Sequence, residues 1–255
     1  MLLAIDIGNT NTVLGVFDGD RLERSWRIKT DARSTADELA LTFRGLLADH
    51  KITGTAACST VPAALRELRT MLAGYYPDVP TVLVEPGVRT GVSLQYENPK
   101  EVGADRIVNT LAAHHLVQGR PAIVVDFGTT TNFDVVSERG DFLGGALAPG
   151  IEISLDALAA RAAQLRKVEL IAPRHPIGKS TVEALQSGVV YGFAGQVDGL
   201  VRRLSAALHP EDPDAVQVIA TGGLATLVIE HCETVDRYEP DLTLLGLRLI
   251  YDRNT

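Results

Sequence analysis

Cysteine is scarce in this 255-residue chain, which has only Cys58 and Cys232. They lie far apart and in no metal-ligand spacing, so we expect reduced core thiols in a cytoplasmic protein. The six histidines form no HExxH-like cluster, and no zinc site is predicted. No apolar run is long enough to span a bilayer, and Asp6 comes too early for a signal-peptide core, so no membrane association is expected.

A basic surface is lacking as well. The chain has 24 Lys and Arg against 32 Asp and Glu, a net charge of −8, and the basic residues are scattered. Nucleic acid is therefore not an expected partner, because binding the phosphate backbone requires a basic face. A hydrophobic content of 45% is enough for the core of one large or two ordinary domains.

One short motif occurs twice. An apolar run, then Asp, any residue, Gly, a small polar residue and Thr, occupies Leu2–Thr10 and again Ala122–Thr130. Each run is predicted to be a buried strand that ends at its Asp. The turn that follows brings backbone N–H groups close to an anion, and the carboxylate can hold a cation. One copy alone would favour a plain hairpin turn, but two copies predict a site for a metal–polyphosphate such as ATP.

The elements around these motifs also repeat, which indicates a duplication. Strands are expected at 13–17, 24–29, 56–59, 81–84, 135–136, 142–147 and 216–220. Helices are expected after a Thr35–Glu38 capping box, after a Thr60 cap, and at 103–116, 154–165, 181–208 and 242–251. The break at 119–121 gives predicted domains of residues 1–118 and 119–255. Glycines in the long helix at 188, 192, 195 and 199 indicate close packing, either within the chain or across a homodimer.

Three further motifs are ambiguous. Gly178-Lys179-Ser180-Thr181 resembles the end of a Walker A loop, but Pro173 stands where a glycine is required and no strand precedes it; we expect a helix cap there. Thr221-Gly222-Gly223 is a strand-to-helix turn or a platform for a flat ring. Gly103–Arg106 is typical of a helix start; alternatively, Asp105 accepts a proton and Arg106 grips a carboxylate.

In combination and in this order, these motifs resemble those of type III pantothenate kinases, members of the sugar-kinase, actin and heat-shock ATPase superfamily. The residues that carry the resemblance are 6–10, Tyr96 with Asn98-Pro99, 103–106, 126–129, Gly144-Gly145 with Pro149-Gly150, and 178–181. The resemblance implies an α/β fold of two actin-like (ribonuclease H-like) domains with ATP in the cleft between them. It also implies a homodimer that phosphorylates pantothenate with ATP in the first step of coenzyme A synthesis.

The family pattern implies roles for individual residues. ATP would be bound with Mg²⁺ by Asp6, Ile7, Gly8, Asn9, Thr10, Asn11, Thr12, Val13 and Thr129. Pantothenate would be bound by Tyr96, Gly103, Ala104, Asp105, Arg106 and Thr181, with Thr181 coming from the partner subunit. Asp105 would be the catalytic proton acceptor, and Asp126 would bind a monovalent cation, potassium or ammonium.

The second turn departs from the family pattern Asp-x-Gly-Thr-Ala-x-Thr-x-Asp. Thr130 replaces a small apolar residue and Asn132 replaces a threonine. This departure supports one alternative to pantothenate phosphorylation, a catalytically weakened ATP-binding dimer. A second alternative also stays open, a kinase of the same fold for another polyol or hydroxy acid, although Tyr96 with Gly103–Arg106 suits a compact alcohol that bears a carboxylate.

Overall fold

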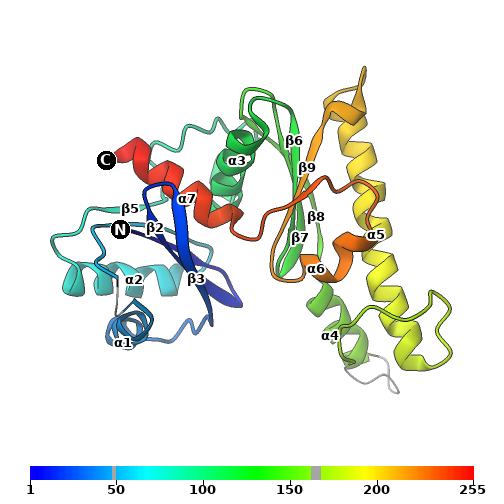
Figure 1. The fold of residues 1–255 in the computed structure, drawn as a ribbon, viewed down its shortest axis with the longest axis horizontal. Helices are drawn as coiled ribbons and strands as arrows, with labels where there is room; N and C mark the ends of the chain where they lie inside the picture. The colour runs from blue at the N-terminus through cyan, green and yellow to red at the C-terminus, as the bar shows by residue number, and fades with distance from the viewer. Residues whose placement is uncertain (48–49, 162–167) are drawn as a thin grey trace. The chain divides into compact units, whose positions relative to one another are not determined.

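The computed structural model describes residues 1–47, 50–161 and 168–255, and the chain divides into two compact units (Figure 1). Unit 1 consists of Met1–Val92, Glu97–Ala112 and Leu242–Thr255. Unit 2 consists of Ser93–Tyr96 and Ala113–Asp241. Each unit contains one five-stranded mixed sheet with its own hydrophobic core.

The sheet of unit 1 has the strand order β3-β2-β1-β4-β5. Its strands are β1 (Leu2–Ile7), β2 (Asn11–Asp18), β3 (Arg21–Lys29), β4 (Gly54–Ser59) and β5 (Thr81–Leu83). The first three are antiparallel neighbours, while β4 runs parallel to β1 and β5 parallel to β4. The apolar run that predicted a buried strand is therefore the central strand of the sheet.

The sheet of unit 2 repeats this topology in the order β10-β9-β6-β7-β8. Its strands are β6 (Ala122–Phe127), β7 (Thr130–Val136), β8 (Phe142–Pro149), β9 (Gln217–Thr221) and β10 (Arg237–Tyr238). Here β6 is central, β7 is antiparallel to β6 and β8 is antiparallel to β7, while β9 runs parallel to β6 and β10 parallel to β9. The matching topology supports the duplication that the repeated motif predicts.

Helices cover both faces of the first sheet because side chains alternate along β1. Leu3, Ile5 and Ile7 pack with α1 (Ala36–Leu47) and α2 (Pro62–Tyr75). Ala4 on the other face packs with α3 (Ala104–Val117) and α7 (Leu242–Asn254). Asp6 follows Ala4 on this second face, so its carboxylate points toward the side of the sheet that holds the start of α3.

The position of α7 differs from the predicted domain division. Residues 119–255 were expected to form one domain, but Leu242–Thr255 belongs to unit 1. Three apolar side chains of α7, Leu244, Leu247 and Ile250, are buried in the same cluster as Ala4 and Ala56. The burial of this apolar face against the first sheet returns the end of the chain to unit 1.

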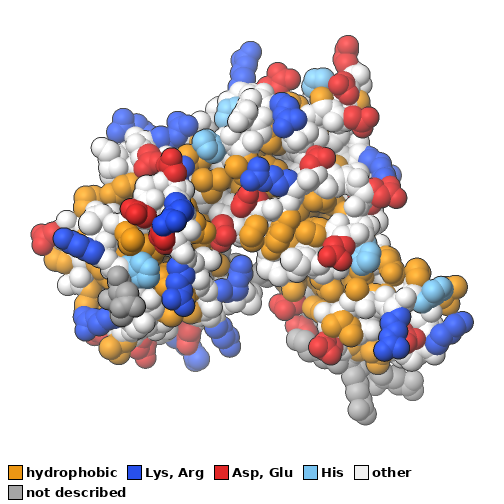
Figure 2. All heavy atoms as spheres, viewed as in Figure 1, with side chains coloured by type: hydrophobic (Ala, Val, Ile, Leu, Met, Phe, Trp, Pro, Cys, Tyr) orange, Lys and Arg blue, Asp and Glu red, His pale blue; other side chains and the backbone are white. Residues whose placement is uncertain are grey.

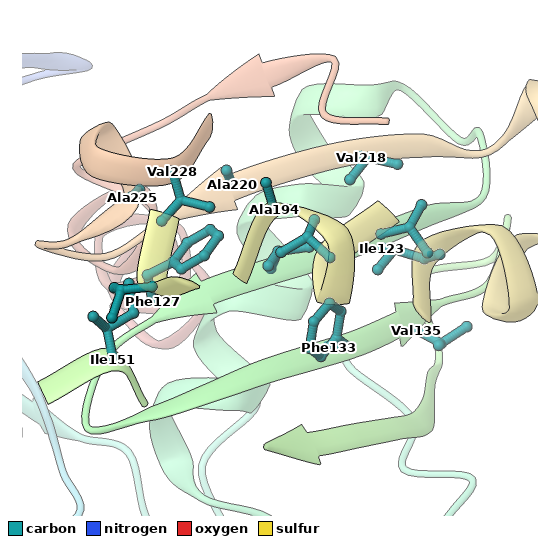
Figure 3. Packing of buried hydrophobic residues seen from close by; sticks show 14 of the residues in the cluster. Ile123, Phe127, Phe133, Val135, Ile151, Ala194, Val218, Ala220, Ala225 and Val228 are labelled. Carbon is teal, nitrogen blue, oxygen red and sulfur yellow. The ribbon is translucent and has the colours of Figure 1, made fainter. Parts of the chain in front are cut away.

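The core of unit 2 lies between its sheet and two helices, α4 (Ile151–Arg161) and α5 (Thr181–Leu208). Figure 3 shows Ile123, Phe127 and Phe133 pointing toward the layer that contains Ala194 of α5. The shorter elements are η1 (Pro99–Glu101), η2 (Pro213–Ala215), α6 (Ala225–Val228) and η3 (Ile229–His231). Because odd-numbered residues of β6 and β7 face this core, Asp126 and Asn132 face the opposite side of the sheet.

Two of the three predicted helix caps are confirmed. Thr35 and Glu38 form the capping box, with the Thr35 N–H donating to Glu38 Oε2 at 2.8 Å, and the Ser180 side chain caps α5 by accepting from the Glu183 N–H. The expected Thr60 cap is wrong, because α2 begins at Pro62 and Val61 occupies its cap position. Helix α4 begins at Ile151, and the expected helix end at residue 165 lies outside the described residues.

The surface mixes charges of both signs, as Figure 2 shows for the face it draws. Lys and Arg side chains alternate there with Asp and Glu, the ordinary pattern of a solvated surface. Among the described residues, no helix combines the length and hydropathy that crossing a bilayer requires.

Candidate functional site: two strand-end carboxylates

The first turn is shorter than the run predicted to bind ATP. β1 ends at Ile7 and β2 begins at Asn11, and the Gly8 N–H donates to Asn11 O at 3.0 Å. Asn11, Thr12 and Val13 therefore belong to β2 rather than to the turn. Residues 8–10 form a tight hairpin connection at the end of the central strand.

The end of β3 supports this turn. The Thr30 N–H donates to Thr10 O at 2.9 Å, and the hydroxyls of Thr12 and Thr30 lie 2.9 Å apart. Thr12 is buried, so its hydroxyl serves this structural pair. The residues of the turn exposed to solvent are Asn9 and Thr10.

Asp6 lies in an acidic and weakly hydrated environment. Removal from water, with the nearby negative charge of Asp105, raises the pKa of Asp6 from 3.8 to about 7. The Cys58 thiol lies 3.4 Å from Asp6 Oδ1 and donates to it, which partly offsets that rise. Burial and the two carboxylates raise the pKa of Cys58 well above its usual value, so Cys58 remains a protonated donor.

Cys58 was expected to be a core thiol, and it is buried, but its contact with Asp6 was missed. β1 and β4 pair in parallel with Asp6 opposite Cys58, which places both side chains on one face. The next residue, Ser59, ties the two strand ends together by donating from its hydroxyl to Ile7 O at 3.2 Å. The signal for this arrangement is the strand register, which local sequence patterns do not provide.

Asp105 lies in the first turn of α3 and bonds to its own helix. Its Oδ1 accepts from the Arg106 N–H at 2.9 Å. Removal from water raises the pKa of Asp105, and the Arg106 backbone bond and charge oppose that rise. The helix-start interpretation therefore holds locally, and it leaves a half-buried carboxylate of raised pKa near Asp6.

Gly103 provides the space that this carboxylate occupies. A Cβ atom at residue 103 would lie only 2.4 Å from Asp105 Oδ1, far inside van der Waals contact. Any side chain at residue 103 would therefore displace the Asp105 carboxylate. Arg106 is buried, with 9% of its surface exposed, so it is not the surface residue that the simple helix-start interpretation predicts.

The second turn is built on a narrower connection. Phe127 pairs with Thr131 across it, and the Gly128 N–H donates to Thr130 O at 3.0 Å. Thr129, the predicted ATP contact, lies at its exposed tip. The Gly150 N–H donates to Thr129 O at 3.2 Å, so the Pro149-Gly150 segment supports this turn.

Asp126 stands between two polar neighbours on its face of the sheet. It pairs with Asn132 on β7 and with Thr221 on β9. Gly222, at φ +96°, packs closely here: a Cβ atom would lie 2.7 Å from Asp126 Oδ1 and 2.6 Å from Phe127 O. This close packing within the chain explains the glycine at residue 222 without the ring-platform interpretation.

The donor atoms around Asp126 suit a hard cation. The Asp126 carboxylate and the Phe127 carbonyl both supply oxygen near Gly222, and alkali and alkaline-earth ions prefer oxygen ligands. Within the described ranges, His, Cys, Asp and Glu form no metal-binding cluster of three or more. Magnesium ions typically take one or two carboxylates together with substrate phosphates, which fits Asp6 at the end of β1.

The two remaining predicted substrate residues, Tyr96 and Thr181, both lie in unit 2. Tyr96 belongs to unit 2, where the Gln95 N–H donates to Phe142 O at 2.9 Å and the Tyr96 and Phe142 rings lie 5.8 Å apart. The tyrosine ring is 38% exposed. Thr181 is the exposed first residue of α5. The structure thus brings Asp6 and Gly103–Arg106 together in unit 1, and Asp126 and Thr129 together in unit 2.

The glycines of α5 lie on an open face of the helix. A Cβ atom at Gly188, Gly192 or Gly195 would have no described atom within 4 Å. Packing within the described part of the chain therefore does not explain these three glycines. The homodimer alternative stays a prediction.

The sequence profile of the family described as type III pantothenate kinase matches residues 2–203. The chain belongs to this family. The type III pantothenate kinase of Frankia alni is 68% identical over 254 residues, covering all of both chains. That of Salinispora arenicola is 68% identical over 256 residues with the same full coverage, and that of Acidothermus cellulolyticus is 65% identical, covering 99% of that relative.

Solved structures place this type III pantothenate kinase family member among the sugar kinases by fold. A ROK hexokinase from Thermus thermophilus matches with a TM-score of 0.52 at 19% identity, covering 99% of this chain and 98% of that one. A ROK family glucokinase from Streptomyces griseus matches with a TM-score of 0.50 at 14% identity and the same coverage. These likenesses confirm the predicted fold class of two actin-like α/β domains.

Proposed function

We propose that this chain phosphorylates the primary hydroxyl of pantothenate with ATP, the first step of coenzyme A synthesis. Membership of the type III pantothenate kinase family supports this activity. The observation that carries the chemistry is Asp105, fixed at the start of α3 by the Arg106 N–H with Gly103 leaving room for it. A carboxylate of raised pKa is a suitable proton acceptor for an alcohol.

Phosphoryl transfer requires positioning and charge neutralisation more than covalent chemistry. The pantothenate hydroxyl oxygen bonds to the γ-phosphorus as the bond to the bridging oxygen of ADP breaks, and Asp105 takes the hydroxyl proton. Arg106 holds the pantothenate carboxylate or fixes the loop around it. Tyr96, Gly103, Ala104 and Thr181 complete the binding of pantothenate.

The two strand-end turns bind the ATP phosphates and the cations. Residues 6–13 bind the ATP phosphates, with Asp6 near the Mg²⁺ that ATP carries, and Thr129 contacts ATP from the second turn. Asp126, with its oxygen-rich surroundings, holds potassium or ammonium. When bound, these cations would offset the negative charge of the phosphates. The side chains of Asp105 and Arg106 orient pantothenate, and Asp105 accepts its proton.

A coupled assay of ADP release with a panel of hydroxyl acceptors tests the activity. The panel contains pantothenate, other hydroxy acids and sugars. Release that requires pantothenate supports the proposal. Release with another hydroxy acid alone supports a same-fold kinase of different specificity, and ATP binding without release for any acceptor supports an inactive ATP-binding dimer.

We also propose that the enzyme is a cytoplasmic homodimer that joins through α5. The open glycine face of this helix supports the idea, because small residues allow two helices to approach closely. Gly192→Leu should convert the dimer to a monomer on sizing and light scattering, and weaken pantothenate binding if Thr181 acts across the interface. The matched control Gly45→Leu also changes a helical glycine without neighbours, and it should stay dimeric. A wild-type monomer with full activity would contradict the proposal.

A further inference from the structure

Thr130 and Asn132, the two departures from the family pattern, bond to each other. The Thr130 hydroxyl lies 2.6 Å from Asn132 Oδ1 and donates to it. The residues are two apart on β7, so their side chains share one face of the sheet. The two replacements therefore form one hydrogen-bonded unit.

This pair stands next to the carboxylate of the second turn. Asn132 is directly opposite Asp126 across the β6–β7 ladder, and directly opposed side chains on one face lie within contact distance. Thr221 flanks Asp126 on the other side through β9. Thr221, Asp126 and Asn132 therefore form a polar row across three neighbouring strands at the end that carries the Gly128–Thr129 turn.

The Thr130 bond determines which end of the amide is available. It engages the carbonyl oxygen of Asn132, which leaves the amide N–H₂ group as the end of the side chain that this bond does not use. Asn132 is only 8% exposed, and a nearly buried donor favours a partner. An N–H₂ group can only donate, so it suits an anion and not a cation.

We propose that Asn132 binds a phosphate oxygen of ATP through its amide nitrogen, and that Thr130 is the positioning residue that fixes the amide in this orientation. The proposal rests on the proposed assignment of the Asp126–Thr129 turn to ATP. It gives the departure from the family pattern a function: the hydroxyl of the usual threonine is replaced by a longer donor, with a second hydroxyl added to aim it.

Calorimetric titration with a non-hydrolysable ATP analogue tests the proposal without requiring turnover. Asn132→Asp keeps the shape but exchanges the donor for a negatively charged acceptor, and should weaken binding at least tenfold. The matched control Gln217→Glu makes the same change at the start of β9, the opposite end of the sheet, and should leave the affinity unchanged. Thermal melting of each variant confirms that it is folded.

A double-mutant cycle tests the positioning role of Thr130. Thr130→Ala should weaken binding of the analogue severalfold in the wild-type background and have no effect in an Asn132→Ala background. Equal effects in the two backgrounds would overturn the positioning role.

Unchanged analogue affinity in Asn132→Asp, with a stronger response to potassium, would instead show that residue 132 faces the cation and would overturn the phosphate assignment. Wild-type protein that binds no analogue would refute the proposed function itself. Wild-type protein that binds the analogue while Asn132→Asp is unaltered would refute this inference alone.

Discussion

The turn after β1 and the turn after β6 occupy the same place in two sheets of the same topology, yet they differ in length. Residues 8–11 separate the paired Ile7 and Thr12, whereas only residues 128–130 separate Phe127 and Thr131. The residues of the two motifs align in sequence, but the connections between the strands differ in length. A duplicated motif can therefore keep its sequence pattern while its turns acquire different backbone geometry.

The two carboxylates differ more than the turns. Asp6 lies near a second carboxylate, Asp105, and accepts from a thiol. Asp126 pairs instead with two neutral polar residues, Asn132 and Thr221. The first surroundings raise the pKa of Asp6 and favour the proton-bound form of its carboxyl group, and the second place Asp126 beside neutral polar side chains. This contrast favours proton transfer and phosphate binding at the first turn and a monovalent cation at the second.

Asp105→Asn, close to the first turn, should cause the largest loss of activity among these variants. Loss of the proton acceptor should lower kcat by roughly 10²–10⁴-fold, the usual range for a general base, while ATP still binds. Steady-state kinetics with calorimetric ATP titration measure both quantities. A kcat near the wild-type value would remove Asp105 from the reaction.

Gly103→Ala should displace the same carboxylate without removing it. The added Cβ would overlap Asp105 Oδ1, and a misplacement of about 1 Å in a catalytic group costs roughly 10²-fold in turnover. The control Gly74→Ala adds a methyl group where no described atom lies within 4 Å, and it should keep full activity. Equal activity of the two variants would show that the Asp105 position tolerates movement.

Gly222→Ala tests the proposed cation site at Asp126, in the second turn. Its Cβ would overlap Asp126 Oδ1, so the potassium concentration that half-activates the enzyme should rise severalfold. Gly119→Ala carries a similar backbone strain, with φ +84° against +96°, but its nearest neighbour is 3.9 Å away. An identical potassium response in both variants would assign the effect to strain alone.

Asp6→Asn gives the smallest of the expected effects, a change in how the free energy of unfolding depends on pH. The pKa of Asp6 is about 7 in the folded protein against 3.8 as a model group, so the folded state holds more protons between these values. The contribution of Asp6 to the free energy of unfolding therefore falls as the pH rises from about 4 to 7. Without ATP or metal, urea unfolding should show the variant gaining stability over wild type at pH 8 relative to pH 4.5; the exposed control Asp78→Asn should not.

Local patterns predicted the elements that carry the site. The apolar runs ending at Asp6 and Asp126 gave both central strands, and Ser180 gave the start of α5. These features depend on residues close together in the chain, whose periodicity and capping chemistry are visible in sequence.

Features that depend on distant residues were missed. The Cys58–Asp6 contact follows from the parallel register of β1 with β4. The return of α7 to unit 1 follows from burial of Leu244 and Leu247 against a sheet formed by the other end of the chain. The family resemblance supplied the proposed role of Asp105, but the fit between its carboxylate and Gly103 follows only from the structure.

Potassium dependence of ADP release tests the proposed division of labour most directly. Wild-type protein and Asp126→Ala are compared with saturating ATP and pantothenate, with potassium titrated against sodium at constant ionic strength. The division predicts pantothenate-dependent release that rises with potassium in the wild type and no potassium response in Asp126→Ala. The same potassium activation in both proteins would contradict the assignment of the cation to the second turn.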